Sequence, residues 1–169
     1  MLRRSKTDRA AAAAADALEQ SAGRGVLVAN DDDDSRELLC RVIAGQGAVS
    51  MPAYDMEGVI QAVVGTTGIG AMVLDFSNGT ATSFSILEAV RQELSEAGRP
   101  MPAVMMIATS SANRTLAFDS GVDEFLTRPF HVDEFTTALA EMMGRSVEER
   151  EAKRVEASLA GRGLQDLQD

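Results

Sequence analysis

The sequence lacks tryptophan entirely and has only one cysteine, one histidine and one tyrosine among its 169 residues. A single cysteine cannot form an internal disulfide bond. Cys40 lies in an apolar run with no histidine near it in sequence, so we expect a buried small side chain rather than a nucleophile, which is the usual state of free cysteine.

The sequence also lacks long apolar runs. It contains no stretch of about 20 uncharged apolar residues, the length needed to span a bilayer, and its N-terminus has no apolar signal-peptide core. These absences predict a cytoplasmic protein without membrane association. The length corresponds to one compact domain with tails, which leaves no room for a second catalytic or DNA-binding domain.

Positive charge is scarce in the central part of the chain. The whole sequence carries a net charge of −10, whereas residues 25–144 alone hold 6 basic and 17 acidic residues, a net charge of −11. An acidic body repels the phosphate backbone, so we expect no binding to nucleic acid.

Three regions differ in composition. Residues 1–24 combine basic side chains with an alanine run and are expected to form a flexible or weakly helical tail. Residues 25–144 alternate short apolar runs with amphipathic stretches and should form the folded domain. Residues 145–169 are mostly charged with a thin apolar line, which predicts a solvated helical tail.

Five strands are predicted in the central region. Three continuous apolar runs suit parallel strands that are covered on both faces, and two weaker runs end before prolines; the five are residues 26–29, 48–51, 71–74, 104–107 and 124–127.

Helical periodicity lies between and after these strands. The first helix should be capped by Asp34 with Glu37 and should bury Leu38, Leu39, Val42 and Ile43. The second helix should bury Met56, Val59, Ile60 and Val63, and the third should bury Phe84, Leu87, Val90 and Leu94. The fourth is a short helix over 113–120, and the fifth should bury Phe135, Leu139 and Met142. Five such units predict an α/β fold, a flavodoxin-like doubly wound (βα)5 sandwich with a parallel sheet in the order 2-1-3-4-5.

Polar residues gather where the predicted strands end. Asn30 and Asp31 follow the first strand, Asp75 follows the third, Thr109 the fourth, and Arg128 the fifth. In an open parallel sheet ligands bind beyond the carboxyl ends of the strands. Carboxylates converging there suit Mg²⁺, and a carboxylate can act as a nucleophile toward phosphorus.

Three motifs at these strand ends resemble those of bacterial response-regulator receiver domains. They are VLVANDDDDSRELL at 26–39, MVLD at 72–75 and GVDEFLTRPF at 121–130. The resemblance covers residues 25–143, and the combination of three ordered motifs is specific. It implies a single-domain response regulator of two-component signal transduction.

The resemblance assigns roles residue by residue. Asp75 would be the phosphoacceptor, and Mg²⁺ would be bound by Asp31, by Asp75, by the backbone carbonyl of Ser77 and by the amide oxygen of Asn30. Arg128 stands in the position of the usual lysine, with a cis bond to Pro129. Phe125 takes the aromatic switch position, and the switch hydroxyl falls on Ala108 or, one residue later, on Thr109.

Partners follow from the same resemblance: a histidine kinase or phosphotransfer protein upstream, a protein effector downstream, and a second copy in a homodimer. Three departures from the family pattern bear on activity. Asn30 replaces a first acidic residue, which should weaken Mg²⁺ affinity; Arg128 is planar and longer than lysine; and Gly79 replaces a common proline.

Two alternatives remain. The departures at Asn30 and Arg128 are compatible with a pseudo-receiver, an interaction module that works without phosphorylation. The segment 74–80 faintly resembles the aspartate loop of haloacid-dehalogenase phosphatases, but Ser77 stands where that class needs an acidic residue.

Overall fold

The computed structural model describes residues 25–167, with the side chains of 165 and 166 outside the description. The tail predicted at residues 1–24 lies outside the described residues. Strands and helices alternate along the chain: β1 (Gly25–Asn30), α2 (Asp33–Gly45), β2 (Val49–Ala53), α3 (Met56–Gly65), β3 (Ile69–Asp75), α4 (Thr80–Glu96), β4 (Ala103–Ala108), α5 (Arg114–Asp119), β5 (Glu124–Thr127), α6 (Val132–Gly144) and α7 (Val147–Asp166).

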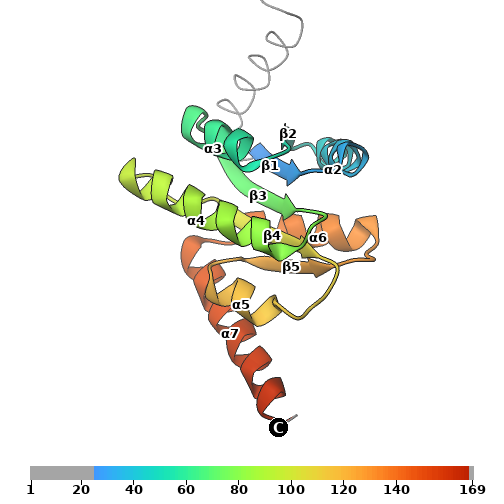
Figure 1. Ribbon diagram of the computed structural model, residues 1–169, viewed down its shortest axis with the longest axis vertical. Coiled ribbons are helices and arrows are strands. Elements are labelled where there is room, and N and C mark those ends of the chain that lie inside the picture. The colour runs from blue at the N-terminus through green and yellow to red at the C-terminus, as the bar shows by residue number, and fades with distance from the viewer. Residues whose placement is uncertain (1–24, 168–169) are drawn as a thin grey trace, which may run out of the picture.

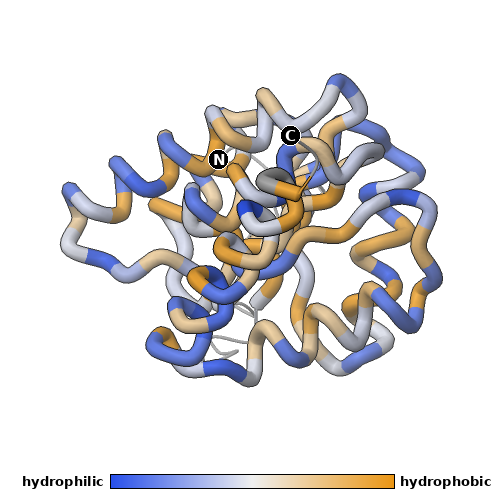
Figure 2. The backbone as a smooth tube through the Cα atoms, turned by 90° about the horizontal axis from the view of Figure 1, so that it is seen from below, coloured by the Kyte–Doolittle hydropathy of each residue, from blue (hydrophilic) through white to orange (hydrophobic). Residues whose placement is uncertain are grey.

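The five strands form one parallel sheet in the order β2-β1-β3-β4-β5, which confirms the predicted fold class. Helices cover both faces (Figure 1). One apolar cluster joins the sheet to α3, α4 and α5, and the other joins it to α2 and α6. The central strands are apolar throughout because both of their faces are buried. Figure 2 shows the apolar segments in the centre and the hydrophilic turns outside.

Two predictions about strand and helix ends were wrong. Asp32, not Asp34, caps α2, because its carboxylate accepts a hydrogen bond from the backbone N–H of Ser35 at 2.7 Å. Pro52 does not stop β2 but lies within it, paired with Val28. This is possible because β2 is an edge strand, where a missing N–H on the open side costs no ladder bond.

Two side chains expected to be buried in the core are exposed to solvent to a considerable extent. Leu38 is 57% exposed and Met56 is 36% exposed, whereas Leu39, Ile43 and Val59 are buried as predicted. Leu38 instead lies on the rim of an apolar groove between α2 and α6. Cys40 is half-buried, and burial raises the pKa of its thiol, which disfavours the reactive thiolate.

The helix predicted after α6 is present as α7 (Val147–Asp166), and its apolar side chains Val147, Val155 and Leu159 are exposed, although the helix also contacts the domain. α7 packs along α5, and Figure 1 shows it running beside α5 and away from the sheet. Basic side chains of α7 reach three acidic residues of the domain, namely Asp119, Asp123 and Glu124. Its apolar line is thin, as the sequence indicated, and four of its basic side chains form ion pairs with the domain.

Candidate functional site

The site is built where β1 and β3 end side by side. Asn30 pairs with Asp75 in the parallel register of the two strands, so both side chains emerge at the carboxyl edge of the sheet. Asp31 follows Asn30, and Ser77 follows two residues after Asp75. Arg128, after β5, reaches across to the same place. The structure therefore brings these five predicted site residues together.

Asp75 is the buried centre of the site. Asp75 is only 5% exposed. One carboxylate oxygen, Oδ2, accepts a hydrogen bond from the amide Nδ2 of Asn30 at 2.9 Å and another from the guanidinium of Arg128. None of the hydrogen bonds found within residues 25–167 reaches the other oxygen, Oδ1. Two donors therefore hold Oδ2, whereas Oδ1 is available to react.

The charge on Asp75 is only partly compensated. Burial raises the pKa of its carboxyl, the hydrogen bond and charge of Arg128 lower it, and the nearby carboxylates of Asp31 and Asp32 raise it again. The net shift is upward. A buried carboxylate that keeps a raised pKa beside a cation is a common property of functional sites.

A stability prediction follows from this raised pKa. A carboxyl group whose pKa is higher in the folded protein favours folding at low pH and loses that contribution as the pH rises through the folded pKa. Asp75→Asn, which removes the charge with little change of shape, should therefore stabilise the protein by about 0.5–2 kcal/mol at neutral pH, the range usual for such relief. Urea unfolding at pH 7 and pH 4 measures the gain, which should shrink at the lower pH. A loss of stability at pH 7 would contradict the prediction.

The amide of Asn30 has a fixed orientation. Its Oδ1 accepts the backbone N–H of Asp32 at 2.8 Å, so its Nδ2 is turned toward Asp75. Because the backbone N–H of Asp32 can donate only to the amide oxygen of Asn30, the amide has a single orientation. The side chain that the resemblance assigned as a metal ligand therefore presents a hydrogen-bond donor to Asp75.

Asp31 lies on the exposed side of the site, where its carboxylate is hydrogen-bonded to Ser77. Its Oδ1 accepts the backbone N–H of Ser77 at 2.9 Å, and its Oδ2 accepts the hydroxyl at 2.6 Å. The hydroxyl contact and then the backbone contact lower the pKa of Asp31. The carboxylate is therefore ionised through the neutral range, which is the state a cation requires.

The remaining predicted residues lie around a pocket of about 190 Å³ beside Asp75. Ala108 ends β4 and Thr109 follows it, and both line this pocket together with Arg128. Thr109 carries the hydroxyl, and Ala108 has none. The bond between Arg128 and Pro129 is cis, as the resemblance implied, and Phe125 is buried in β5.

Sequence reasoning missed two residues of this pocket. Asn113, next to α5, donates from Nδ2 to the hydroxyl of Thr80, the first residue of α4, at 2.7 Å. Both line the pocket, and their bond links the start of α4 to the residue before α5. The residues are 33 positions apart in sequence, and each by itself is ordinary for a helix start, so the pairing gave no local signal.

The donor set fits Mg²⁺ in part. Asp31 and Asp75 supply two carboxylates on neighbouring strand ends, which is the number that Mg²⁺ sites usually use. The amide oxygen of Asn30 is engaged with Asp32 and does not fit as a ligand. Within residues 25–167 no group of three or more His, Cys, Asp or Glu side chains is arranged around one point, so any ion here depends on these two carboxylates, backbone carbonyls and water.

Comparisons with known proteins agree with this architecture. The chain is 27% identical over 145 residues to the transcriptional regulatory protein TcrA of Mycobacterium tuberculosis, which covers 78% of this chain and 55% of the relative. It is 28% identical over 111 residues to the transcriptional regulatory protein DltR of Streptococcus agalactiae, covering 64% of this chain and 47% of that protein. The chain therefore spans about half the length of these curated relatives. No family model matches it.

Solved structures show the same fold. A two-component response regulator from Clostridium difficile superposes with a TM-score of 0.60 at 17% identity, covering 72% of this chain and 96% of the other. The Vibrio cholerae chemotaxis protein CheY4 gives 0.60 at 18% identity, covering 70% and 97%. TrrA of Thermotoga maritima, solved in complex with Mg²⁺-BeF, gives 0.58 at 17% identity, covering 70% and 97%.

The resemblance read from the three sequence motifs is thereby confirmed, and the chain has the fold of response-regulator receiver domains. Among the described residues, no helix combines the length and apolar character that crossing a bilayer requires.

Proposed function

We propose that this chain is the receiver of a two-component signalling pathway and takes a phosphoryl group on Asp75. The observation that carries the proposal is the state of Asp75: a buried carboxylate at the topological switch point of the sheet, with Oδ2 held by Asn30 and Arg128 and with no hydrogen bond to Oδ1 from the described part of the chain. The free oxygen, Oδ1, is the nucleophile.

The reaction balances without further reactants. Oδ1 forms a bond to phosphorus, and the phosphorus–nitrogen bond of a kinase phosphohistidine breaks. The imidazole leaves with the electron pair and is neutral, because its other ring nitrogen keeps the proton that it carried in the phosphohistidine. Arg128 stays beside the acyl phosphate and offsets its added negative charge, as arginine does in phosphate sites. The result is a larger, more negative group in the pocket next to Thr109.

A bound Mg²⁺ ion would offset charge on the phosphoryl oxygens. The residues that would hold it are Asp31, Asp75 and the carbonyl of Ser77. Asn30 serves a different purpose in this proposal: it orients Asp75 through its N–H group. Because Asn30 takes the place of an acidic residue, we also propose that the affinity for Mg²⁺ is weakened.

The partners proposed are a histidine kinase or phosphotransfer protein, a downstream protein effector and a second copy in a homodimer, and the proposed location is the cytoplasm. The curated relatives are named as transcriptional regulators and are about twice as long as the matched region. The acidic body argues against direct contact of this domain with nucleic acid. Nothing in the comparisons favours the pseudo-receiver alternative.

Mass analysis of the intact protein tests the proposal. Incubation with acetyl phosphate and Mg²⁺ should add the mass of one phosphoryl group, since the same attack releases acetate from this small donor. The Asp75→Asn variant should gain none, and an excess of EDTA should reduce the gain at least tenfold if the ion acts as proposed. Absence of any gain in the unmodified protein, over a wide range of Mg²⁺ concentrations, would leave the pseudo-receiver as the better description.

A further inference from the structure

α5 directly follows a segment that lines the Asp75 pocket and includes Ser110, Ala112 and Asn113. The helix has only six residues, and the residue that precedes it, Asn113, lines the pocket and bonds to Thr80. Two of its residues, Ala117 and Phe118, are buried against the sheet side. A helix of less than two turns has little internal stability, so its neighbours determine its position.

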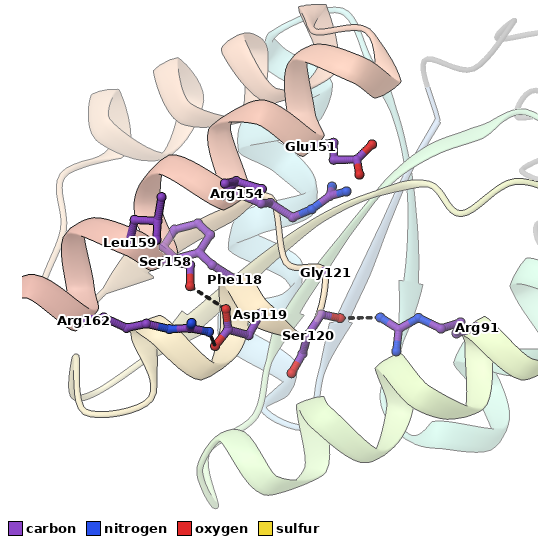
Figure 3. A pocket seen from close by; sticks show the side chains of 11 residues that line it. Arg91, Phe118, Asp119, Ser120, Gly121, Glu151, Arg154, Ser158, Leu159 and Arg162 are labelled. Carbon is purple, nitrogen blue, oxygen red and sulfur yellow. Dashed lines mark hydrogen bonds and ion pairs between the residues drawn. The ribbon is translucent and has the colours of Figure 1, made fainter.

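α7 is the main neighbour on the outer side of α5. Figure 3 shows Ser158 and Arg162 of α7 pointing at Asp119, the last residue of α5. Ser158 donates its hydroxyl to one carboxylate oxygen, and Arg162 donates to the other at 2.9 Å. These contacts lower the pKa of Asp119, so the pairing persists across the neutral range.

The two helices also approach closely at a glycine. A Cβ atom placed on Gly161 would lie 2.1 Å from the hydroxyl oxygen of Thr115 and 3.3 Å from its Cβ. No larger side chain fits there without movement of one helix or of Thr115. Gly163, one half-turn further on α7, has nothing within 4 Å of such an atom. Of the two glycines of α7, only Gly161 therefore lies in close contact with α5.

The other end of α7 is anchored to the rigid sheet. Arg150 and Arg154 both bind the buried carboxylate of Asp123, and Lys153 binds Glu124. α7 is therefore fixed to the start of β5 at one end and to α5 at the other. Any displacement of α5 must work against this attachment.

We propose that α7 is a regulator of the Asp75 pocket: by clamping α5 it holds the preceding pocket segment, which ends at Asn113, in place and resists its displacement by a phosphoryl group on Asp75. The part that concerns the phosphoryl group rests on the proposed function. Coupling of this kind is reciprocal, so a change at the pocket segment loosens α7 as much as a change at α7 loosens the segment. Typical coupling changes an equilibrium about 5–150-fold.

The decisive variant is Gly161→Leu, which forces α7 away from Thr115, with Gly163→Leu as its matched control on the same helix. Hydrogen exchange of the backbone amides in 109–120 should become at least fivefold faster in Gly161→Leu and stay unchanged in the control. The milder Gly161→Ala should be restored by a second change, Thr115→Ala, which makes room for the added methyl group. Faster exchange confined to α7, with α5 unaffected, would overturn the clamp.

The reciprocal arm starts from the pocket. Thr80→Ala removes the partner of Asn113 without touching α7, and it should raise the exchange of amides in 147–162 at least twofold. Unchanged exchange there would refute coupling across α5. Neither exchange measurement requires phosphorylation, so both test the clamping of α5 by α7 even if Asp75 accepts no phosphoryl group.

Phosphoryl uptake, measured by intact mass in the same samples, completes the test. Uptake from acetyl phosphate should be at least threefold faster in Gly161→Leu than in Gly163→Leu. Equal uptake rates would overturn the regulatory role while leaving the proposed function intact. No uptake in the unmodified protein would instead contradict the proposed function.

Discussion

Replacing Asp123 by alanine is expected to lower the free energy of unfolding by about 3 kcal/mol, because removal of one partner leaves buried charge uncompensated. The carboxylate is 2% exposed. It accepts the backbone N–H of Val104 at 2.9 Å and both Arg150 and Arg154 of α7. In Asp123→Ala these two cations, themselves mostly covered, lose their shared anion, and a strand N–H loses its acceptor.

Urea unfolding measures this loss, which should shift the midpoint by about 1–2 M for a domain of this size. Asp119→Ala is the matched control, since it removes an aspartate that also pairs with α7 but is more exposed; exposed pairs contribute about 0–1 kcal/mol. A loss for Asp123→Ala no larger than that of the control would mean that α7 is not anchored through this carboxylate.

The strands and the gathering of the site residues could be predicted because their causes are local. Continuous apolar runs such as those ending at Asn30 and Asp75 require burial on both faces, and parallel strands place their carboxyl ends at one edge. The sequence could not show which aspartate of the run 31–34 caps α2. Each of the four has the same chemistry, and only the backbone path places Asp32 over Ser35.

The orientation of Asn30 and the docking of α7 depend on contacts that are distant in sequence. A pattern can say that asparagine replaces an acidic residue, but the N–H of Asp32 decides that its amide nitrogen faces Asp75. Likewise Arg150 and Arg154, four residues apart, signal a charged helix face. Their common partner, Asp123, is found only after β5 has been placed against α7.

Arg128→Ala is expected to slow phosphoryl uptake by roughly 10²–10³-fold, the range seen when one preorganised donor to developing negative charge is removed. Arg128 is the cation that contacts Asp75, and it is the first influence that lowers the pKa of this buried carboxyl. Without it the pKa rises further, so a smaller fraction of Asp75 is ionised, and the added phosphoryl charge has no cation beside it.

The two effects of Arg128 separate with pH. Raising the pH ionises Asp75 in Arg128→Ala and should restore the part of the rate that was lost through its pKa, whereas the loss of charge neutralisation should persist at every pH. Arg128→Lys retains the charge and should keep uptake within about tenfold of the unmodified protein, since lysine binds phosphate as a point charge. Arg41→Ala removes an equal charge from an exposed surface pair and controls for net charge. If Arg128→Ala matched Arg41→Ala in rate, Arg128 would be only a structural counter-ion, and Asp75 would have to be activated by Asn30 and a bound cation alone.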